Sequence, residues 1–318
     1  VMKFNIYEKY LYYSVAYSLV IIAVFPIYWT FISSLKVPSE LINSSPTFFP
    51  NIITFEYYLD VWNLNNVSQK INLADTFWNS TIVSLGTIFL TIVLTTLTGY
   101  SLSTFSFPFK NVIFILLILP ILVPGLSLIV PLYKLLKDLR LLDTYLGLIF
   151  LHTVGMLPLG TFMMRNSFDS IPKSLREISI LEGAGEMKII LTVMLPLALP
   201  GLLTVMVFAM YQSWNDYLMA FIFTNKPEMT MLNVGLAKIA RGGSQFEMKW
   251  GHLTAGSMIS FIPIIIFYTF TTGILNLNCI KFLKFLLKKK ITSSIHDKKS
   301  LNSDYIFSFQ FIALYFNE

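Results

Sequence analysis

Long apolar runs separated by shorter polar stretches dominate the chain. A helix that crosses a bilayer needs about 20 mostly apolar residues, and six runs meet that length. We place the six predicted spans at about residues 10–33, 76–104, 111–132, 144–164, 201–223 and 253–274. The pattern therefore predicts an all-α polytopic membrane protein. Residues 1–275 would form the six-span domain, and residues 276–318 an atypical basic cytoplasmic tail.

Prolines interrupt two of the apolar runs. Pro120 and Pro124 predict a kink in the third span, where neighbouring helices can satisfy the freed backbone groups. The run that begins at Ile189 is too long for one crossing. Because Pro196 and Pro200 divide it, we place the fifth span after them.

Shorter elements are predicted around the spans. Asn79 and Ser80 are residue types that start helices, and we expect them to begin the second one. Leucines recur at helical spacing in residues 134–143, which predicts an amphipathic helix lying at the membrane interface. Residues 34–75 read as a loop that holds short helices, and residues 225–252 as a second long loop.

Composition supports a membrane protein. The chain is 55% hydrophobic and 13% charged, whereas soluble domains carry about 25% charged residues. Mean hydropathy is +0.68. The net charge of +6 does not indicate a nucleic-acid partner, because the basic residues flank the apolar runs and the tail rather than forming a patch. A single cysteine excludes an intrachain disulfide, and the sequence predicts no metal site and no cofactor.

The distribution of lysine and arginine predicts the orientation. With both termini in the cytoplasm, 14 of the 23 basic residues fall on the inner side and nine on the outer side. The bias follows the positive-inside rule, although residues 134–140 oppose it locally. We expect a multi-pass protein of the plasma membrane, with residues 166–196 in the cytoplasm and both long loops outside.

One charged segment, Ser174–Gly201, interrupts the apolar pattern. Ser174 and Glu177 have the spacing of a capping box, in which each side chain satisfies a backbone donor at a helix start. Gly183 or Gly185 would end that helix, and a second helix would run from Glu186 to the prolines. On these grounds alone the segment is either a connector between spans or a docking element.

The same segment resembles the cytoplasmic signature loop of binding-protein-dependent ABC importer permeases, whose pattern is E-A-A-x3-G-x9-I-x-L-P. Glu177 and Gly183 occupy the first and fourth fixed positions, and Leu195-Pro196 close the pattern in register. Ile178 and Ser179 replace the two alanines, and Val193 replaces the isoleucine. Further stretches are similar to the smaller six-span subunit of the carbohydrate branch, the maltose and multiple-sugar type: "FPIYWTFISSLKVPSEL", "LLDTYLGLI" and "SWNDYLMAFIF".

The resemblance implies a transport subunit rather than an enzyme. Its expected partners are a second permease subunit, a cytoplasmic ATPase dimer, an extracellular solute-binding protein and the lipid bilayer. It implies that a short helix of the loop docks on the ATPase and transmits its closure to the spans. The residues expected to couple are Glu177, Gly183 and Ala184, with Leu175, Ile178 and Leu181 as the docking face. Pro196 and Pro200 would form a rigid joint to the fifth span.

Polar residues within the spans leave alternatives open. Asn215 and Asp216 are candidates for the translocation path, or else cap an interfacial end beside Trp214 and Tyr217. His152 is expected to be a hydrogen-bonded interhelical residue. The turn at Arg241 either contacts the solute-binding protein or is a plain surface turn.

The sequence leaves two alternative functions open. An ABC importer for a non-sugar solute, such as glycerol phosphate or a polyol, fits the same loop. A secondary transporter would show an internal repeat or intramembrane acidic pairs, and neither is visible. The sequence has no P-loop, so ATP hydrolysis is expected on separate subunits.

The resemblance to the permease family fades after about Phe270, which indicates either a shifted reading frame or an unusual extension.

Overall fold

A computed structural model describes residues 6–42, 45–63, 72–241 and 248–296, with side chains left out at Ile6, Glu8, Asn63 and residues 276–296. This part of the chain is helical almost throughout. Its only extended pairing is an isolated antiparallel bridge between Lys36 and Ile53. The predicted all-α class is therefore confirmed.

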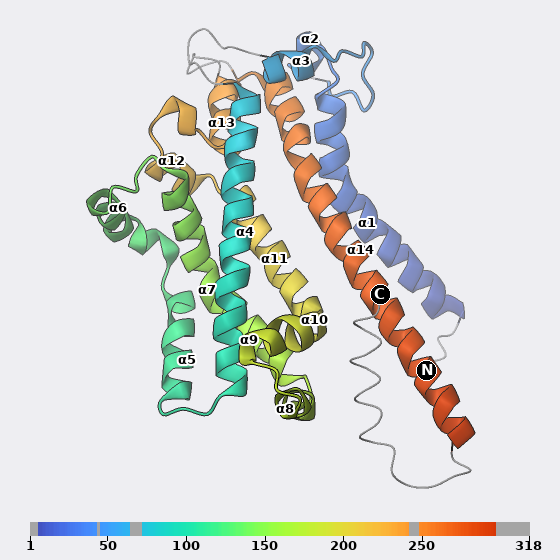
Figure 1. Cartoon of the computed structure of the whole chain (residues 1–318). Coiled ribbons are helices and arrows are strands. Elements are labelled where there is room, and N and C mark those ends of the chain that lie inside the picture. Colours follow the sequence, from blue (N-terminus) through green and yellow to red (C-terminus); the bar gives the residue numbers. More distant parts are fainter. Residues whose placement is uncertain (1–5, 43–44, 64–71, 242–247, 297–318) are drawn as a thin grey trace. The chain divides into compact units, whose positions relative to one another are not determined.

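The elements follow one another along the chain as Figure 1 shows. They are α1 (Ile6–Ser33), α2 (Pro38–Leu41), α3 (Glu56–Asn63), α4 (Leu73–Thr104), α5 (Lys110–Ile118), η1 (Leu119–Leu122), η2 (Gly125–Leu128), α6 (Ile129–Asp138), α7 (Tyr145–Asp169), α8 (Lys173–Leu181), α9 (Glu186–Ile189), the π-helical η3 (Ile190–Met194), α10 (Leu195–Leu197), α11 (Leu199–Trp214), α12 (Leu218–Phe223), η4 (Pro227–Met229), α13 (Leu232–Arg241) and α14 (Trp250–His296).

Among the described residues, four helices are long and apolar enough to cross a membrane. They are Lys9–Ser33 within α1, all of α4, all of α7 and Trp250–Leu275 within α14. Their ranges coincide with the first, second, fourth and sixth predicted spans. Two bent helix pairs raise the number of candidate spans to as many as six if each pair counts as one.

The first bent pair replaces the predicted third span. Helices at Lys110–Leu122 and Gly125–Asp138 meet at 97°, a break rather than the kink expected for residues 111–132. Val123 is extended there, with ψ of 124°, because a residue before proline is pushed out of the helical region. Pro124 also lies outside the helical region, with ψ of 120°.

The interfacial helix predicted at residues 134–143 is also misplaced. Helix α6 begins at Ile129 and ends at Asp138. Arg140 has a φ of +56°, and the amides of Arg140 and Leu141 bond back to Lys137 and Leu136. These bonds close the helix in the manner of a Schellman motif, so the leucine periodicity continues past the true end.

The second bent pair surrounds the fifth span. Helices at Glu186–Leu197 and Leu199–Trp214 meet at 83°. The helix within the predicted fifth span, residues 201–223, is interrupted: α11 ends at Trp214 and α12 begins at Leu218.

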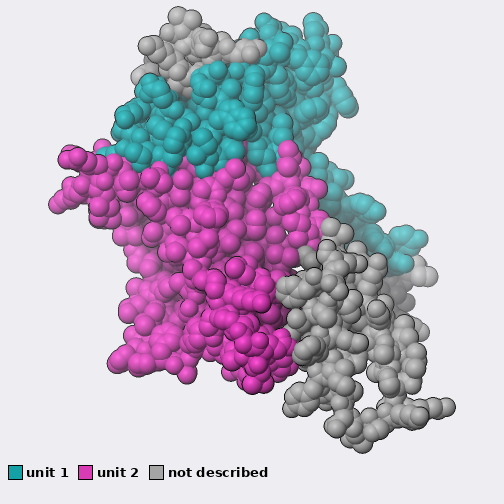
Figure 2. Space-filling view, viewed as in Figure 1, with its two compact units in different colours: residues 1–82, 142–145, 215–263 teal, residues 83–141, 146–214, 264–318 magenta. Residues whose placement is uncertain are grey.

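The chain divides into two compact units, which Figure 2 shows in teal and magenta. Unit 1 comprises residues 1–82, 142–145 and 215–263; unit 2 comprises residues 83–141, 146–214 and 264–318. Within unit 2, α7 lies directly against its neighbours. A Cβ at Gly160 would come within 2.7 Å of Thr95 on α4, and one at Gly201 on α11 would overlap Ser167. These glycines permit the close helix packing that is common between membrane helices.

Unit 1 holds both long loops. Helix α4 begins at Leu73, where the Asn72 side chain accepts the amide of Ala74 at 3.0 Å. The prediction that Asn79 and Ser80 start this helix is therefore wrong. Asn79 donates instead to the carbonyls of Glu228 (2.7 Å) and Thr230 (3.0 Å) in the second long loop.

Candidate functional site

The signature segment begins with the short helix α8. The predicted capping box is absent, because α8 starts at Lys173 after Pro172 and its N-cap makes no side-chain hydrogen bond. The amide of Leu175 bonds to the carbonyl of Pro172 at 3.2 Å and closes the first turn. Pro172 fixes the backbone just before the helix at ψ 127°, outside the helical region, so that the helix begins at Lys173. Ser174 therefore lies inside the helix, and Glu177 is exposed.

Gly183 ends α8, as predicted. Its φ is +81°, a left-handed conformation that residues with a side chain rarely adopt. The amide of Gly183 bonds to Ile180 at 2.9 Å, and the amide of Ala184 bonds to Ser179 at 3.0 Å. This pair of bonds is a Schellman motif. It fixes the direction in which the chain leaves the helix.

A second arm leads from the turn to the fifth span. It begins at Glu186, as expected, and passes into the π-helical turn Ile190–Met194 before the first proline. Pro196 and Pro200 lack amide hydrogens, so the ladder cannot continue unbroken through both residues. The 83° bend falls between them.

The apolar side chains of the segment differ in exposure. Leu181 is 88% exposed at the tip, and Ile180 and Met187 are also exposed. Leu175 and Ile178 are half-buried, as is Ala184. The predicted docking-face residues Leu175, Ile178 and Leu181 therefore differ in solvent exposure. The exposed apolar side chains lie around the Gly183 turn.

A polar cluster that the sequence analysis missed ties the two arms together. Arg176 of α8 and Glu186 of α9 form an ion pair across the turn. Tyr100 of α4 donates to Glu186 Oε2 at 2.6 Å and accepts from Arg176 Nε at 3.2 Å. The nearest sequence signal is the opposite charge of residues 176 and 186 on either side of two glycines; nothing local points to Tyr100.

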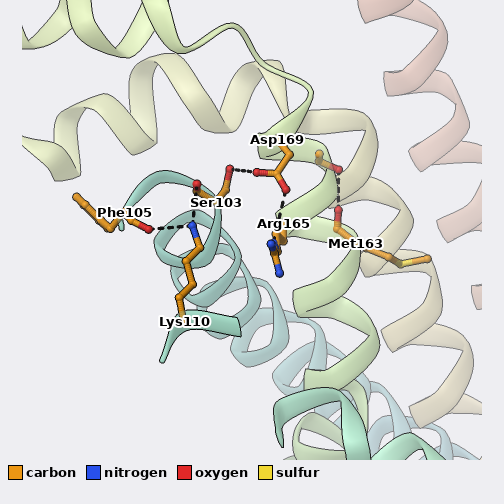
Figure 3. Close-up of polar contacts among 7 residues, drawn as sticks. Ser103, Phe105, Lys110, Met163, Arg165 and Asp169 are labelled. Atoms are coloured by element: carbon orange, nitrogen blue, oxygen red, sulfur yellow. Dashed lines mark hydrogen bonds and ion pairs between the residues drawn. The ribbon is translucent and has the colours of Figure 1, made fainter. Parts of the chain in front are cut away.

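Further polar contacts join the end of α4 to residues 105–110 and to α7, as Figure 3 shows. Lys110 Nζ donates to the carbonyls of Ser103 (3.3 Å) and Phe105 (2.8 Å), which lie at the end of the helix. A cation at this position satisfies carbonyls that have no intrahelical donor. Ser103 also donates to Asp169 of α7 at 2.6 Å, and Asp169 pairs with Arg165 at 3.6 Å.

Asp216 lies at the break between α11 and α12. Its carboxylate accepts the amides of Met219 (3.1 Å) and Ala220 (2.8 Å), which are the first free donors of α12. Asn215 is exposed. This geometry is that of a helix cap, one of the two roles that the sequence left open.

Two other candidate positions are placed as follows. His152 is buried on α7. Arg241 ends α13, and the remainder of the predicted turn at Gly242 and Gly243 lies outside the described residues. Within the described ranges, no three His, Cys, Asp or Glu residues gather into a group that could hold a metal ion.

These features define the class of the protein. It is a polytopic all-α membrane protein in which a polar-bonded helix–turn–helix segment connects the apolar helices α7 and α11. Residues 92–278 match the binding-protein-dependent transport system inner membrane component family. The chain belongs to this family, whose members are transport subunits of ABC importers rather than enzymes.

Relatives of the chain with known names are also ABC transporter permeases. The chain is 32% identical to the inner membrane ABC transporter permease protein YcjP of Escherichia coli, over 78% of this chain and 86% of that protein. It is 29% identical to the diacetylchitobiose uptake system permease protein NgcG of Streptomyces coelicolor, over 78% and 80%. It is 30% identical to the trehalose transport system permease protein SugB of Mycobacterium tuberculosis, over 77% and 86%. The predicted likeness to the carbohydrate branch is confirmed.

The fold is shared with a solved structure. A chain of a bacterial ABC transporter involved in the import of the acidic polysaccharide alginate superposes with a TM-score of 0.73. The match covers 86% of this chain and 99% of that one, at 21% identity. It supports the all-α polytopic fold.

Proposed function

We propose that the chain is the permease subunit of an ATP-driven importer for a carbohydrate, and that residues 166–196 couple the ATPase to the spans. The observation that carries this proposal is the Gly183 turn. It presents the exposed Leu181 at the end of a helix whose direction is fixed by the turn itself. An exposed apolar tip on a rigid support favours a protein partner.

The mechanism follows from these parts. When the ATPases close on ATP, they displace the tip of α8. The rigid turn passes this displacement to α9, and the prolines at residues 196 and 200 direct it into α11. Glu177 and Ala184 contribute to the docking surface, together with Leu175, Ile178 and Leu181. The spans then alternate between inward- and outward-facing arrangements.

The partners follow from the family. A second permease subunit would complete the pore, an ATPase dimer would bind on the cytoplasmic side, and a solute-binding protein would deliver the solute outside. We propose six spans, with each bent pair crossing once and both termini in the cytoplasm. The residues 276–318 then form a basic cytoplasmic tail.

The solute is proposed from the relatives, because the names of two of them refer to diacetylchitobiose and trehalose. An alternative is a non-sugar solute such as a polyol or glycerol phosphate. One relative, GgtD of Synechocystis, is named for osmoprotective compounds, which favours keeping this alternative. A secondary transporter is less well supported, since it would need no docking tip.

Co-purification tests the proposal. The chain is expressed with the ATPase, second permease and binding-protein genes found beside it, and the tagged chain is purified. We expect the ATPase and second permease to co-purify, and the binding protein to bind a sugar in a thermal-shift screen. A binding protein that responds to polyols and to no sugar would support the alternative solute class. Failure of the ATPase to co-purify, with the chain folded and inserted, would contradict the importer assignment.

A further inference from the structure

The Gly183 turn fixes the direction of the chain as it leaves α8, but it does not by itself hold α8 against the membrane-spanning helices. Within unit 2, the polar contacts between α8 and the neighbouring helices in the described side chains centre on Arg176. This guanidinium bonds to Tyr100 of α4 and pairs with Glu186 of α9. It also lies over the ring of Phe105, 5.4 Å from its centre.

We propose that Arg176, Glu186 and Tyr100 form a clamp that makes α8, α9 and the end of α4 move as one body. This proposal rests on the proposed coupling function and assigns to these three side chains a positioning role in it. Without the clamp, the tip of α8 could be displaced by a partner without moving α4.

The charges of the clamp are suited to a lasting contact. Hydrogen bonding to Glu186 raises the pKa of the Arg176 guanidinium, a group that is charged at neutral pH in any environment. The side chain of Arg176 is 23% exposed and that of Glu186 is 41% exposed. The planar guanidinium can face two acceptors and a ring at once, which a lysine ammonium cannot do equally well.

The position of Tyr100 on α4 is fixed by close packing. Tyr100 is 1% exposed. Its ring packs edge-on against Phe105 at 5.9 Å and against Phe168 of α7 at 5.6 Å. The hydroxyl is therefore held in one place, where it donates to Glu186 and accepts from Arg176. A displacement of α8 that reaches Tyr100 reaches α7 through the same ring.

Distance measurements between spin labels test the clamp without knowledge of the solute. In the assembled importer with Cys279→Ser, labels are placed at Lys173→Cys on α8 and Phe89→Cys on α4, both of which are exposed. Distances are recorded without nucleotide, with Mg²⁺-ATP, and after vanadate trapping. We expect one narrow distribution that does not change between these states, because the two helices move together.

Variants of the clamp residues are compared with the wild-type distance distribution. Arg176→Gln and Tyr100→Phe should lose the narrow distribution, and their distance should shift on addition of ATP. Lys188→Gln, which removes an exposed charge from α9, should leave the distribution unchanged. The exchanged pair Arg176→Glu with Glu186→Arg should restore it. If Arg176→Gln does not assemble, Tyr100→Phe, which removes a single oxygen, decides the question.

The measurements distinguish failure of the clamp from failure of the proposed coupling function. A narrow, nucleotide-independent distribution in Tyr100→Phe and Arg176→Gln would overturn the clamp. So would a wild-type distance that changes with ATP. In contrast, an absence of any ATP-dependent distance change between α8 and a label on the second permease subunit would overturn the proposed coupling function, whatever the clamp variants show.

Discussion

Gly99 of α4 lies directly against Met164 of α7: a Cβ added at residue 99 would approach the Cβ of Met164 to 2.7 Å. It would also lie 2.9 Å from the backbone nitrogen of Arg165. Backbone atoms cannot yield as the end of a flexible side chain can. The two helices are therefore in contact one residue before Tyr100, where the polar cluster begins.

Gly99→Ala is expected to lower stability. Forcing a methyl group into this contact should cost about 1–3 kcal/mol, as overpacking does elsewhere. The midpoint of thermal unfolding of the purified importer should fall. Gly273→Ala in α14 is the control, because a Cβ there would meet no atom within 4 Å. An equal effect of both substitutions would mean that α4 and α7 are not closely packed at Gly99.

Substitution of Gly183 tests the turn. No atom of this chain lies within 4 Å of a Cβ at this position, so within the chain a substitution acts through the left-handed backbone and not through a clash. A non-glycine residue pays about 1–2 kcal/mol in this conformation. We expect Gly183→Val to abolish solute-stimulated ATP hydrolysis, Gly183→Asp to reduce it strongly, and Gly183→Asn to be mildest. Membrane insertion should stay normal throughout, as judged by protease protection. Full stimulation in Gly183→Val would show that the turn geometry is not needed.

Two roles of Asp216 can be distinguished: a helix cap, or a charge in the translocation path. Asp216→Asn keeps an oxygen that can accept from Met219 or Ala220, so a capping role predicts near-normal uptake. Asp216→Ala removes the cap and should destabilise α12 by about 1 kcal/mol. Uptake by proteoliposomes separates the roles. Loss of uptake in Asp216→Asn, with stability unchanged, would instead favour a role of the charge in the path.

Asn79 is predicted to hold the second long loop in place. Its amide donates to Glu228 and Thr230, and its carbonyl accepts from Tyr145 at 2.6 Å. Asn79→Ala leaves buried partners unsatisfied, at a cost of about 1–3 kcal/mol each. Hydrogen exchange over residues 227–241 should become faster. Thr81→Ala, which loses only a bond within its own helix, is the control. Unchanged exchange in Asn79→Ala would remove this role.

The sequence alone was sufficient to locate helices and helix ends where these depend on the local pattern of residues. The apolar runs located the long helices α1, α4 and α7, and the glycine at position 183 located the end of α8. Prolines indicated where helices are interrupted, but not by how much. The 97° and 83° bends depend on how the flanking helices pack, which residue spacing does not encode.

Contacts between distant residues could not be read from the sequence. Tyr100 and Glu186 are far apart in the chain, and their pairing depends on how α4 lies beside α8 and α9. For the same reason, Asn79 read as a helix start, although its amide binds a loop that follows about 150 residues later. Ser174 and Glu177 fit a capping pattern, but the helix already begins at Lys173, directly after Pro172.

Cross-linking from the tip of α8 tests the central claim most directly. Leu181→Cys and Phe48→Cys, both at exposed apolar positions, are introduced singly into the assembled importer with Cys279→Ser. A short bifunctional reagent that joins cysteine to lysine is then applied. The account predicts that Leu181→Cys is joined to the ATPase and that Phe48→Cys is not. A cross-link from Phe48→Cys together with none from Leu181→Cys would contradict it.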